Sequence, residues 1–546
     1  MPEQPHSQCL TGRGLSPGLA QGITFVHRDV TALPGEYYDI EAREVDGELE
    51  RLENAMVRIT ADLTALTSRV ENEMDAKLAS IFEAHRMMLN DASLKEELRK
   101  EISSELVCAG SAVKTVFRRW ERRFRSMEAE IARQKGNDVT DLGRRLLSSL
   151  AGIGAHALEK LPLGSVLVAK RLLPSDTLFL GRRSAAAAII ESGGPSSHAA
   201  LFAREIGLPC VTGIPNVTDL VPSGAKVLVD ADCGAATINP SDNQISSFQQ
   251  KLSTHRETGA KAREQARERA VTCDGVAITV VANVGCREDT VDAMDNGAEG
   301  IGLYRIEQVY LARQTLPLVD ELVAEIRRTL EPAGKTPVCV RLLDVGADKQ
   351  LPYLQSMKES NPSLGRRGIR FLRHFPDLLH TQIEALSRLS AEYDLSVLVP
   401  MVTMPEDMAV VRGVLTETAS ICQLSAPPKL GALIETPAAA LSAGALASAS
   451  DFFSVGTNDL TQYAFAADRE NNAVDTYFDD AHEVIFRLIK AIHADVPDIP
   501  LAVCGELAGR HQHVERLLQC GVRSLSVAPH LVPTVKQAVR ESNCGR

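Results

Sequence analysis

The residues best suited to do chemistry form a short run around one histidine, Gly193-Gly194-Pro195-Ser196-Ser197-His198. The glycine pair permits a tight turn, and the small and apolar residues from Ala199 to Ala203 favour a helix capped by Ser196 or Ser197. His198 then falls in the first turn of that helix, where the helix dipole stabilises an anion such as a phosphoryl group. A neutral imidazole attacks phosphorus and the resulting phosphohistidine transfers onward readily, so His198 is a candidate nucleophile. For the motif alone, a capped helix with an incidental histidine is the alternative.

A second group of candidate residues stands at the ends of predicted strands in the C-terminal half. Apolar runs end at Arg305, Arg341, Glu435, Asn458-Asp459 and Cys504. Apolar strands that carry charge only at their carboxyl ends are typical of the catalytic face of a (β/α)8 barrel. Arginines bind phosphate and carboxylate, and carboxylates hold a divalent metal against phosphate oxygens. Such a mouth fits a small, doubly anionic phosphorylated acid.

Eight strand-like runs alternate with helical patterns from about residue 275 to the end of the chain. They read ITVVANV, GIGLYR, VCVRLLD, GIRFL, SVLVPMV, LGALIE, FFSVG and LAVCG. Eight parallel strands are the number that a closed barrel of this class requires.

The N-terminal half combines a helical segment with short strand-like runs. Apolar residues at alternating four- and three-residue steps predict a long amphipathic helix: Val45, Leu49, Leu52, Met56, Ile59, Leu63, Leu66 and Val70. A coiled-coil dimer is one interpretation, and an intramolecular bundle with the further helical patterns to about residue 150 is the favoured one. Strand-like runs at 13–27 and 164–240 place this bundle inside an α/β domain, residues 1–12 suggest a disordered leader, and 244–270 suggest a helical linker.

The composition describes an ordinary globular chain. Its 546 residues are 44% hydrophobic and 24% charged, enough for two or three domains. The net charge of −12 argues against nucleic-acid and acidic-membrane partners, and the basic cluster at 114–125 is interpreted as a solvated helix face. Eleven cysteines without metal-binding spacing argue against zinc. Without a signal peptide or an apolar run of about eighteen residues, we expect a cytoplasmic protein with reduced thiols.

Taken together, these motifs resemble Enzyme I of the bacterial phosphotransferase system, the phosphoenolpyruvate–protein phosphotransferases. The resemblance runs from about Gly14 to Asn543. It rests on GGPSSHAALFARE, GIGLYRIE, RLLDVGADKQLPY, NPSLGRRGIR, ALIETPAAA, DFFSVGTNDLTQYAFAADR and CGELAG. It implies an α/β multidomain fold: a swivelling α/β phosphohistidine domain (13–37 and 152–243) with an inserted α-helical bundle that docks the carrier protein HPr (38–151). A helical linker (244–270) and a phosphoenolpyruvate-binding C-terminal (β/α)8 TIM barrel (271–546) follow.

The resemblance also implies roles for individual residues. His198 matches the phosphorylated histidine, and Cys504 matches the residue that protonates the enolate; a thiol with an ordinary pKa of about 8.5 can donate a proton at neutral pH. Arg305, Arg341 and Arg469 match the substrate-clamping arginines, and Asn458 a contact to phosphoenolpyruvate. Glu435 and Asp459 match the ligands of a Mg2+ cofactor, with Asp459 also at the substrate. Arg367, Asp344 and Lys349 match positions around the mouth, to which we assign a supporting role.

The implied partners are phosphoenolpyruvate, an HPr-type phosphocarrier protein and a second copy of the chain, as a homodimer through the barrel. His85 falls in the stretch that docks HPr in the family, although a core-facing turn is an alternative for the apolar residues of that stretch. Residues 39–105 hold 17 acidic and 9 basic side chains, which suits a basic partner and raises its association rate.

Two other functions are weighed against this one. Pyruvate phosphate dikinase and phosphoenolpyruvate synthase share the histidine domain and barrel, but residues 1–150 show no phosphate-binding glycine loop for the additional ATP domain. The second alternative function is that of a regulatory phosphocarrier with a weakened barrel. It is considered because the chain departs from the family pattern and ends one or two helices earlier than typical members. The departures stand at Ile306, Gln308, Ala347, Glu470 and Glu483. None removes a chemical group, and we expect them to bear on barrel stability, dimerisation and substrate closure.

Overall fold

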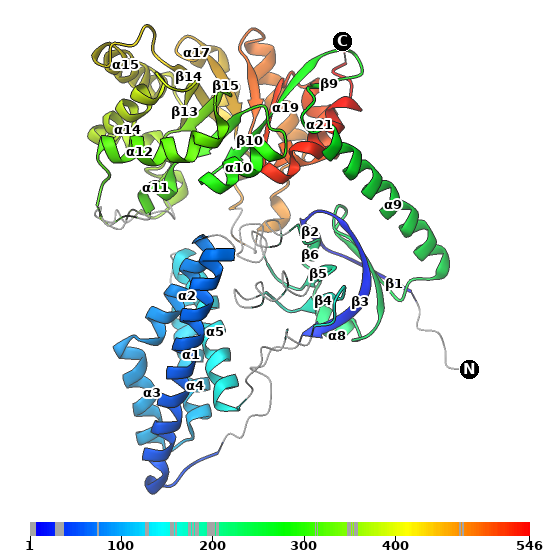
Figure 1. Cartoon of the computed structure of the whole chain (residues 1–546), viewed down its shortest axis with the longest axis vertical. Helices are drawn as coiled ribbons and strands as arrows, with labels where there is room; N and C mark the ends of the chain where they lie inside the picture. The colour runs from blue at the N-terminus through cyan, green and yellow to red at the C-terminus, as the bar shows by residue number, and fades with distance from the viewer. Residues whose placement is uncertain are drawn as a thin grey trace. The chain divides into compact units, whose positions relative to one another are not determined.

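The computed structural model shows two compact units, residues 1–253 and 254–546 (Figure 1). It describes residues 7–27, 38–73, 76–125, 130–152, 158, 161–172, 176, 180, 185–193, 203, 207–311, 313, 315–346, 351, 353, 359–468, 471 and 474–545. The boundary between the units falls inside one continuous helix, α9 (Asp242–Glu264), in the stretch whose composition predicts a helical linker.

A bundle of helices makes up much of the first unit. Its members are α1 (Val45–Glu73), α2 (Ala76–Leu89), α3 (Ala92–Glu105), α4 (Ala109–Arg125) and α5 (Glu130–Leu150). The heptad stripe of α1 faces the inside of this bundle, where Leu52, Met56, Ile59 and Leu63 are buried. Val45 and Leu49 pack against the same core, and the side chains of Leu66 and Val70 lie outside the described part of the chain. The intramolecular bundle is therefore confirmed.

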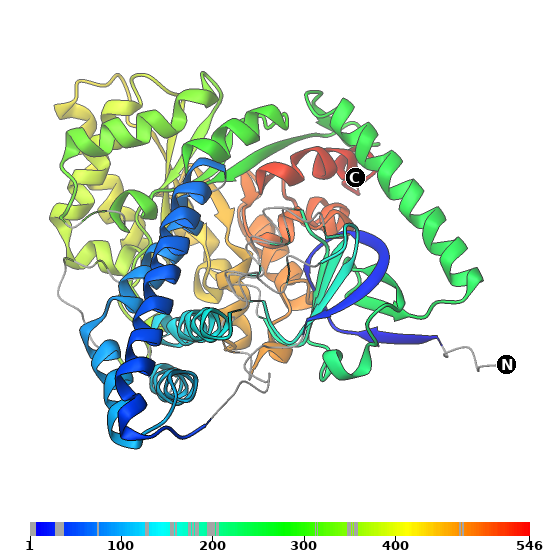
Figure 2. The same cartoon turned by 60° about the horizontal axis from the view of Figure 1, so that its bottom comes forward.

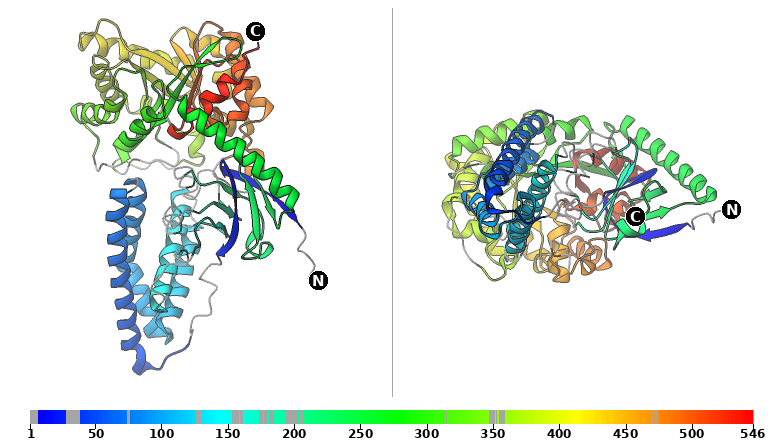
Figure 3. Two further views of the ribbon diagram at one scale, coloured as in Figure 1. Left: turned by 45° about the vertical axis from the view of Figure 1, so that its right-hand side comes forward. Right: turned by 90° about the horizontal axis from the view of Figure 1, so that it is seen from below.

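Local sequence explains where one of these helices begins and how closely two of them pack. Asp91 caps α3, because its carboxylate accepts hydrogen bonds from the amides of Ser93 (2.8 Å) and Leu94 (3.1 Å). Helices α4 and α5 approach at Gly143, where a Cβ would lie 2.8 Å from the ring of Phe117. Figure 3 shows the long axes of the bundle helices running roughly together.

A single mixed sheet is the other main part of the first unit in the described residues. Its strands are β1 (Gln8–Thr11), β2 (Arg13–Ser16), β3 (Leu19–His27), β4 (Val166–Ala169), β5 (Ala187–Ile190), β6 (Cys210–Thr212), β7 (Lys226–Asp230) and β8 (Ala235–Ile238), with the short helix α8 (Val217–Leu220). They lie in the order β1-β8-β7-β3-β4-β5-β6-β2. Since β3 and β4 are parallel neighbours and all five bundle helices come between them in sequence, the bundle is an insertion in the α/β fold.

The expected disordered leader over residues 1–12 is wrong for residues 8–11. These residues form β1, which pairs antiparallel with β8 from Gln8↔Ile238 to Thr11↔Ala235. Only Leu10 of this strand is buried, so the stretch has one apolar anchor and no pattern that would predict a strand. The hydrogen bonds that hold these residues as a strand come from the edge of β8, and that edge exists only in the folded sheet.

The second unit is a closed parallel barrel of eight strands. They are β10 (Ala277–Val284), β11 (Ile301–Arg305), β12 (Val338–Arg341), β13 (Leu395–Val402), β14 (Lys429–Ile434), β15 (Phe452–Val455), β16 (Leu501–Val503) and β17 (Ser524–Val527). Each strand pairs with the next, and β10 pairs with both β17 and β11, which closes the ring. A short strand β9 (Ala270–Val271) pairs antiparallel with β10.

Helices follow the barrel strands and lie around them (Figure 2). They are α10 (Arg287–Asp295), α11 (Glu307–Leu311), α12 (Val319–Leu330), α13 (Ile369–His374), α14 (Pro376–Leu389), α15 (Pro405–Ile421), α16 (Pro437–Leu441), α17 (Ala443–Ala447), α18 (Thr457–Phe465), α19 (Glu483–Asp495), α20 (Val514–Gln519) and α21 (Val532–Arg540). None of the helices in the described ranges is long and apolar enough to cross a membrane.

One expected barrel strand is wrong and one strand of the barrel was missed. The run GIRFL, expected as the fourth strand, belongs to helix α13, because β12 pairs directly with β13 and leaves no place between them. The eighth strand is instead β17, which the sequence analysis missed. In β17 Ser524 and Ser526 alternate with Leu525 and Val527, so no apolar run marks it. A short, mostly apolar run such as GIRFL fits a half-buried helical turn as well as a strand.

Candidate active site at the barrel mouth

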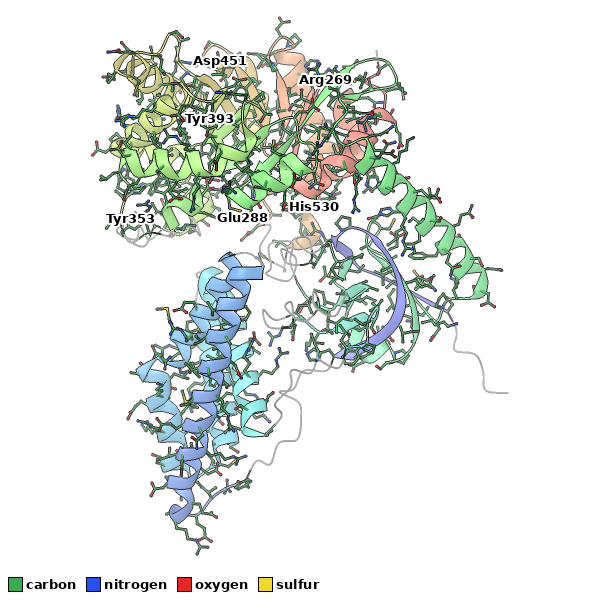
Figure 4. All side chains as sticks on the ribbon, viewed as in Figure 1. Arg269, Glu288, Tyr353, Tyr393, Asp451 and His530 are labelled. Carbon is green, nitrogen blue, oxygen red and sulfur yellow. The ribbon has the colours of Figure 1, made fainter. Side chains whose placement is uncertain are left out.

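The carboxyl ends of the barrel strands bring most of the predicted site residues to one face. Figure 4 marks the two ends of the barrel: Asp451, just before β15, is labelled at one edge, and Glu288 and His530, which follow β10 and β17, at the opposite edge. Because the strands are parallel, the candidates that end or follow them share the second edge. Arg305 and Arg341 are direct neighbours there, paired in the β11–β12 register.

Arg367 lies at the centre of the charged network. Its guanidinium donates to Asp344 (Nε to Oδ1 3.1 Å, Nη2 to Oδ2 3.0 Å) and to Asp459 (Nη1 to Oδ1 2.7 Å, Nη2 to Oδ2 3.0 Å). All three side chains are buried. Burial by itself lowers the pKa of Arg367, but the two carboxylates outweigh it and hold that pKa well above its usual range. Arg367 is therefore a fixed cation that aligns two acids.

Arg341 is held by acids on one side and carries an unused donor on the other. Its Nη2 donates to Glu307 Oε1 (2.8 Å), and its Nη1 lies 3.2 Å from Asp344 Oδ2. Burial opposes the charge, yet Glu307 and Asp344 raise the pKa of Arg341 above its ordinary value. Its Nε is buried and has no hydrogen-bond partner within the described ranges. A buried, permanently charged group with a free donor is suited to bind an anionic ligand.

Glu435 is a buried carboxyl in a space that small residues leave open. It accepts a hydrogen bond from the amide of Met401 (2.9 Å), whose backbone is left-handed with φ 57°. A Cβ at Gly456 would lie 2.8 Å from Glu435 Oε1, so only glycine leaves room for the carboxyl. Burial, reinforced by the charges of Asp459 and Asp344, raises the pKa of Glu435 to about 8 against the opposing effect of Arg341 and Arg367.

These features fit a divalent cation. Four buried carboxyl groups, Glu307, Asp344, Glu435 and Asp459, face two buried guanidinium groups, Arg341 and Arg367. The described residues contain no cluster of three acidic, histidine or cysteine side chains arranged as a complete cation cage. Mg2+ needs no such cage, because it prefers one or two carboxylates together with substrate oxygens and water.

Cys504 follows β16 and reaches the interior of the barrel. Its side chain packs with Leu303, Leu398 and Leu433 of the strands, and its Sγ lies 3.7 Å from the carbonyl of Val455. Burial raises the pKa of the thiol to about 11, although Ser454, Arg305 and Arg341 act to lower it. The ordinary thiol pKa assumed from sequence is therefore too low. The thiol stays protonated at neutral pH, as a proton donor must.

Asn458 and Glu506 join two adjacent loops of the mouth. Asn458 Oδ1 accepts a hydrogen bond from the amide of Glu506 (3.0 Å). The arrangement fixes the plane of the side-chain amide of Asn458 between α18 and the loop that follows Cys504.

Several candidates lie outside the described residues. They are His198 with its neighbours Ser196 and Ser197, Arg469, Lys349, Ala347 and Glu470. The described residues beside the histidine motif are anchored to the sheet: Thr212 Oγ1 donates to the carbonyl of Gly193 (3.1 Å), and Ser16 Oγ to that of Ala203 (3.2 Å).

Two groups of the mouth were missed by the sequence analysis. Glu307 accepts from Arg341 and from the amide of Asp344 (3.0 Å), so it orients both residues. Its place two residues after Arg305 was the available signal. Tyr463 OH donates to the carbonyl of Ser363 (2.5 Å) and lies 3.5 Å from Arg367 Nη1. Its position on α18, one turn after Asp459, could have been found from helical spacing.

His85 is in the core of the helical bundle. The imidazole is fully buried, edge-on to the ring of Phe82, with Nε2 3.4 Å from Asp138 Oδ1. His85 therefore lies in the core together with the apolar residues Phe82 and Leu89 of the same stretch, for which the core-facing alternative holds. In the basic cluster of α4, Arg119 pairs with Glu97 and Glu101 of α3.

A closed barrel with this mouth, together with a mixed α/β domain carrying an inserted bundle, defines a multidomain enzyme that handles a small phosphorylated acid. Comparison with known proteins gives the same class. Three family profiles match in succession: "PEP-utilising enzyme, N-terminal" at residues 11–135, "mobile domain" at 161–234 and "PEP-binding domain" at 259–544.

Curated relatives extend the match over nearly the whole chain. The phosphoenolpyruvate-protein phosphotransferase of Haloferax volcanii is 35% identical over 546 residues, 98% of this chain and 94% of that protein. The proteins of the same name from Geobacillus stearothermophilus and Priestia megaterium are 34% and 32% identical, covering 89% and 91% of this chain and 85% and 88% of their own lengths.

The chain belongs to the PEP-utilising enzymes, and within them to the phosphoenolpyruvate–protein phosphotransferases, so the resemblance seen in the motifs is confirmed. Its reaction is phosphoenolpyruvate-dependent phosphoryl transfer in the phosphotransferase system, with a phosphocarrier protein as partner. Enzymes of this family use a divalent metal ion.

Proposed function

We propose that His198 takes the phosphoryl group from phosphoenolpyruvate bound at the barrel mouth and passes it to a histidine of an HPr-type phosphocarrier. The observation that carries this proposal is the buried Arg341, whose Nε donor is unused among the described residues beside a line of carboxyls. Such a group costs free energy unless an anion completes its hydrogen bonds.

In this proposal Arg305, Arg341 and Arg469 bind the phosphate and carboxylate of the substrate, and Asn458 donates its amide to it. The arginines spread the charge of the phosphoryl group over its equatorial oxygens during transfer. Arg367 keeps Asp344 and Asp459 in place, since each of these acids accepts two hydrogen bonds from it.

Glu435 and Asp459 are the proposed ligands of Mg2+. When bound, the ion would neutralise charge on the phosphate and on the developing enolate. Two observations support this assignment: buried carboxyl groups outnumber buried guanidinium groups at the mouth, and Gly456 leaves open space beside Glu435.

Cys504 is the proposed acid. As the phosphorus–oxygen bond of phosphoenolpyruvate breaks and the nitrogen–phosphorus bond to His198 forms, the electron pair stays on the enolate. The thiol then gives its proton to C3 of the enolate, which yields pyruvate, and the thiolate recovers a proton from solvent. The buried, protonated state of the thiol supports this role.

The remaining parts of the chain receive complementary roles. Residues 13–37 and 152–243 carry the histidine, 38–151 dock HPr, 244–270 link the units, and 271–546 bind phosphoenolpyruvate. The acidic balance of residues 39–105 supports a basic carrier. We further propose a homodimer through the barrel and a cytoplasmic location, and the free thiols of all eleven cysteines support a reducing compartment.

The test is labelling with phosphoenolpyruvate carrying radioactive phosphorus, in the presence of Mg2+. The full chain should acquire an acid-labile, alkali-stable label that H198Q loses and the control H255Q, at an exposed histidine of α9, retains. Full labelling of H198Q would overturn the assignment. A wild-type chain that accepts phosphoryl groups only from phosphorylated HPr would instead be the regulatory phosphocarrier.

A further inference from the structure

The loop that carries Cys504 is fixed through its backbone. The amide of Cys504 donates to the carbonyl of Val455 (3.0 Å), and the amide of Glu506 donates to Asn458 Oδ1 (3.0 Å). Between them, Gly505 packs so closely on α18 that a Cβ would come within 1.9 Å of Thr457 Oγ1. The thiol lies 3.7 Å from the Val455 carbonyl, interacts with Ser454 and packs among apolar side chains of the barrel interior. The path of this backbone sets where the thiol enters these contacts.

Asn283 supplies a further restraint on this loop. It stands near the end of β10, at an irregularity in the β10–β11 register. Its Nδ2 donates to the carbonyl of Cys504 (3.1 Å) and to that of Ser526 (3.2 Å). Since β17 lies between β10 and β16 in the sheet, the side chain reaches across one strand to the end of the next.

The surroundings of Asn283 keep its amide in one orientation. The two carbonyls can only accept, so they identify the amide nitrogen of Asn283, and its Oδ1 accepts a hydrogen bond from Ser526 Oγ (2.6 Å). On β11, the other neighbour of β10, a Cβ at Gly302 would lie 2.4 Å from Ser526 Oγ, so the absence of a side chain there makes room for the serine. With both donors used, Asn283 has no amide proton left for a substrate.

A side chain that only joined β10 to β17 would not need to reach the carbonyl of Cys504. The β10–β17 ladder runs from Thr279↔Ser524 to Ala282↔Val527 and ends before Asn283. The Asn283 side chain therefore adds restraints beyond the last paired residue, and it places one of them on the residue that bears the thiol.

We propose that Asn283 is a positioning residue for Cys504: it holds the Cys504 carbonyl so that the thiol meets one face of the enolate. This inference rests on the proposed role of Cys504 as the acid. Proton transfer to carbon requires close alignment of donor and acceptor, and a misplacement of about 1 Å can cost about 10²-fold in rate.

The test compares N283A, S526A and C504A in the full chain, with N296A as the matched control. Asn296 also donates its Nδ2 to a carbonyl (Asp292, 2.8 Å), but at the exposed end of α10. Phosphoenolpyruvate stereospecifically tritiated at C3 is turned over in deuterated water, and the chirality of the pyruvate methyl group is measured together with kcat and KM.

We expect N283A to lower kcat about 10²-fold and to give partly racemic methyl groups, with the KM for phosphoenolpyruvate changed less than about threefold. S526A, which leaves both donors of Asn283 in place, should show a smaller loss in the same direction, and N296A none. If N283A does not fold, the loss of kcat and of stereospecificity in S526A tests the positioning role of Asn283 instead.

Two negative outcomes are distinguishable. If N283A and S526A turn over stereospecifically, with kcat unchanged or lowered only in proportion to the folded fraction, and C504A is impaired, the positioning role of Asn283 is overturned. Stereospecific turnover at the wild-type rate by C504A would overturn the proposed role of Cys504 itself.

Discussion

Replacing Arg367 with methionine should destabilise the barrel strongly. Arg367 is 7% exposed and donates four hydrogen bonds to two carboxylates, Asp344 and Asp459, that are 2% and 6% exposed. Methionine fills much of the same volume but removes the guanidinium that donates two hydrogen bonds to each buried acid, while Asp344 keeps Arg341 Nη1 3.2 Å away. Removing one partner of a buried ion pair costs about 3–5 kcal/mol. For a domain of this size such a loss lowers the melting temperature by about 10 °C.

Calorimetry of the metal-free protein can measure this shift, and tryptophan fluorescence can report separately on the first unit. Trp120 is the single tryptophan of the chain and lies on α4, so its fluorescence follows the first unit and should not change in R367M. R367K should fall between R367M and wild type, since an ammonium restores the charge but cannot reproduce the planar fork of the guanidinium.

The matched control is R388M, at an arginine that pairs with Asp320 and Glu384 but is 44% exposed. Exposed pairs contribute about 0–1 kcal/mol, so R388M should move the barrel transition by no more than about 3 °C. A shift in R367M no larger than that in R388M would refute the reasoning that the buried network stabilises the barrel.

Two further predictions concern titration. Because burial raises the pKa of the Cys504 thiol to about 11, alkylation of Cys504 followed by mass spectrometry should remain slow at pH 8, where the exposed Cys233 reacts; equal rates would contradict the assigned environment. Glu435 has a pKa of about 8 in the folded chain, above the unfolded value, so it stabilises the metal-free barrel at low pH and this contribution is lost as the pH rises through 8. Between pH 6 and 8 the loss is about 2 kcal/mol. Calorimetry in chelator should show this slope in wild type and not in E435Q, and parallel slopes would count against it.

Much of the architecture could be predicted from local patterns. The heptad spacing from Val45 to Leu63 indicated a helix with one apolar stripe, and the core of the bundle contains that stripe. Seven of the eight barrel strands were visible as apolar runs, because strands buried on both faces need apolar residues throughout. The charged residues after those runs were visible for the same reason, since charge is tolerated only where a buried strand ends.

The errors in the predicted fold occur where tertiary contacts decide the local structure. Gly368 to Leu372 is a mostly apolar run, interrupted by Arg370, that becomes part of a helix because β12 and β13 are already neighbours. Ser524 to Val527 alternates polar and apolar residues, yet β16 and β10 offer it free hydrogen-bonding edges on both sides. No residue in either segment carries that information by itself.

At the barrel mouth, sequence by itself determined which kinds of groups are present: arginines, carboxyls, an amide and a thiol after buried strands. Only the tertiary structure decided their partners and charge states. Arg367 aligns Asp344 and Asp459 from a loop between two strands, and Glu435 and Cys504 hold their protons more tightly than in water because folding removes them from solvent. Distance and burial set these properties, and both arise when segments far apart in the chain close into one barrel.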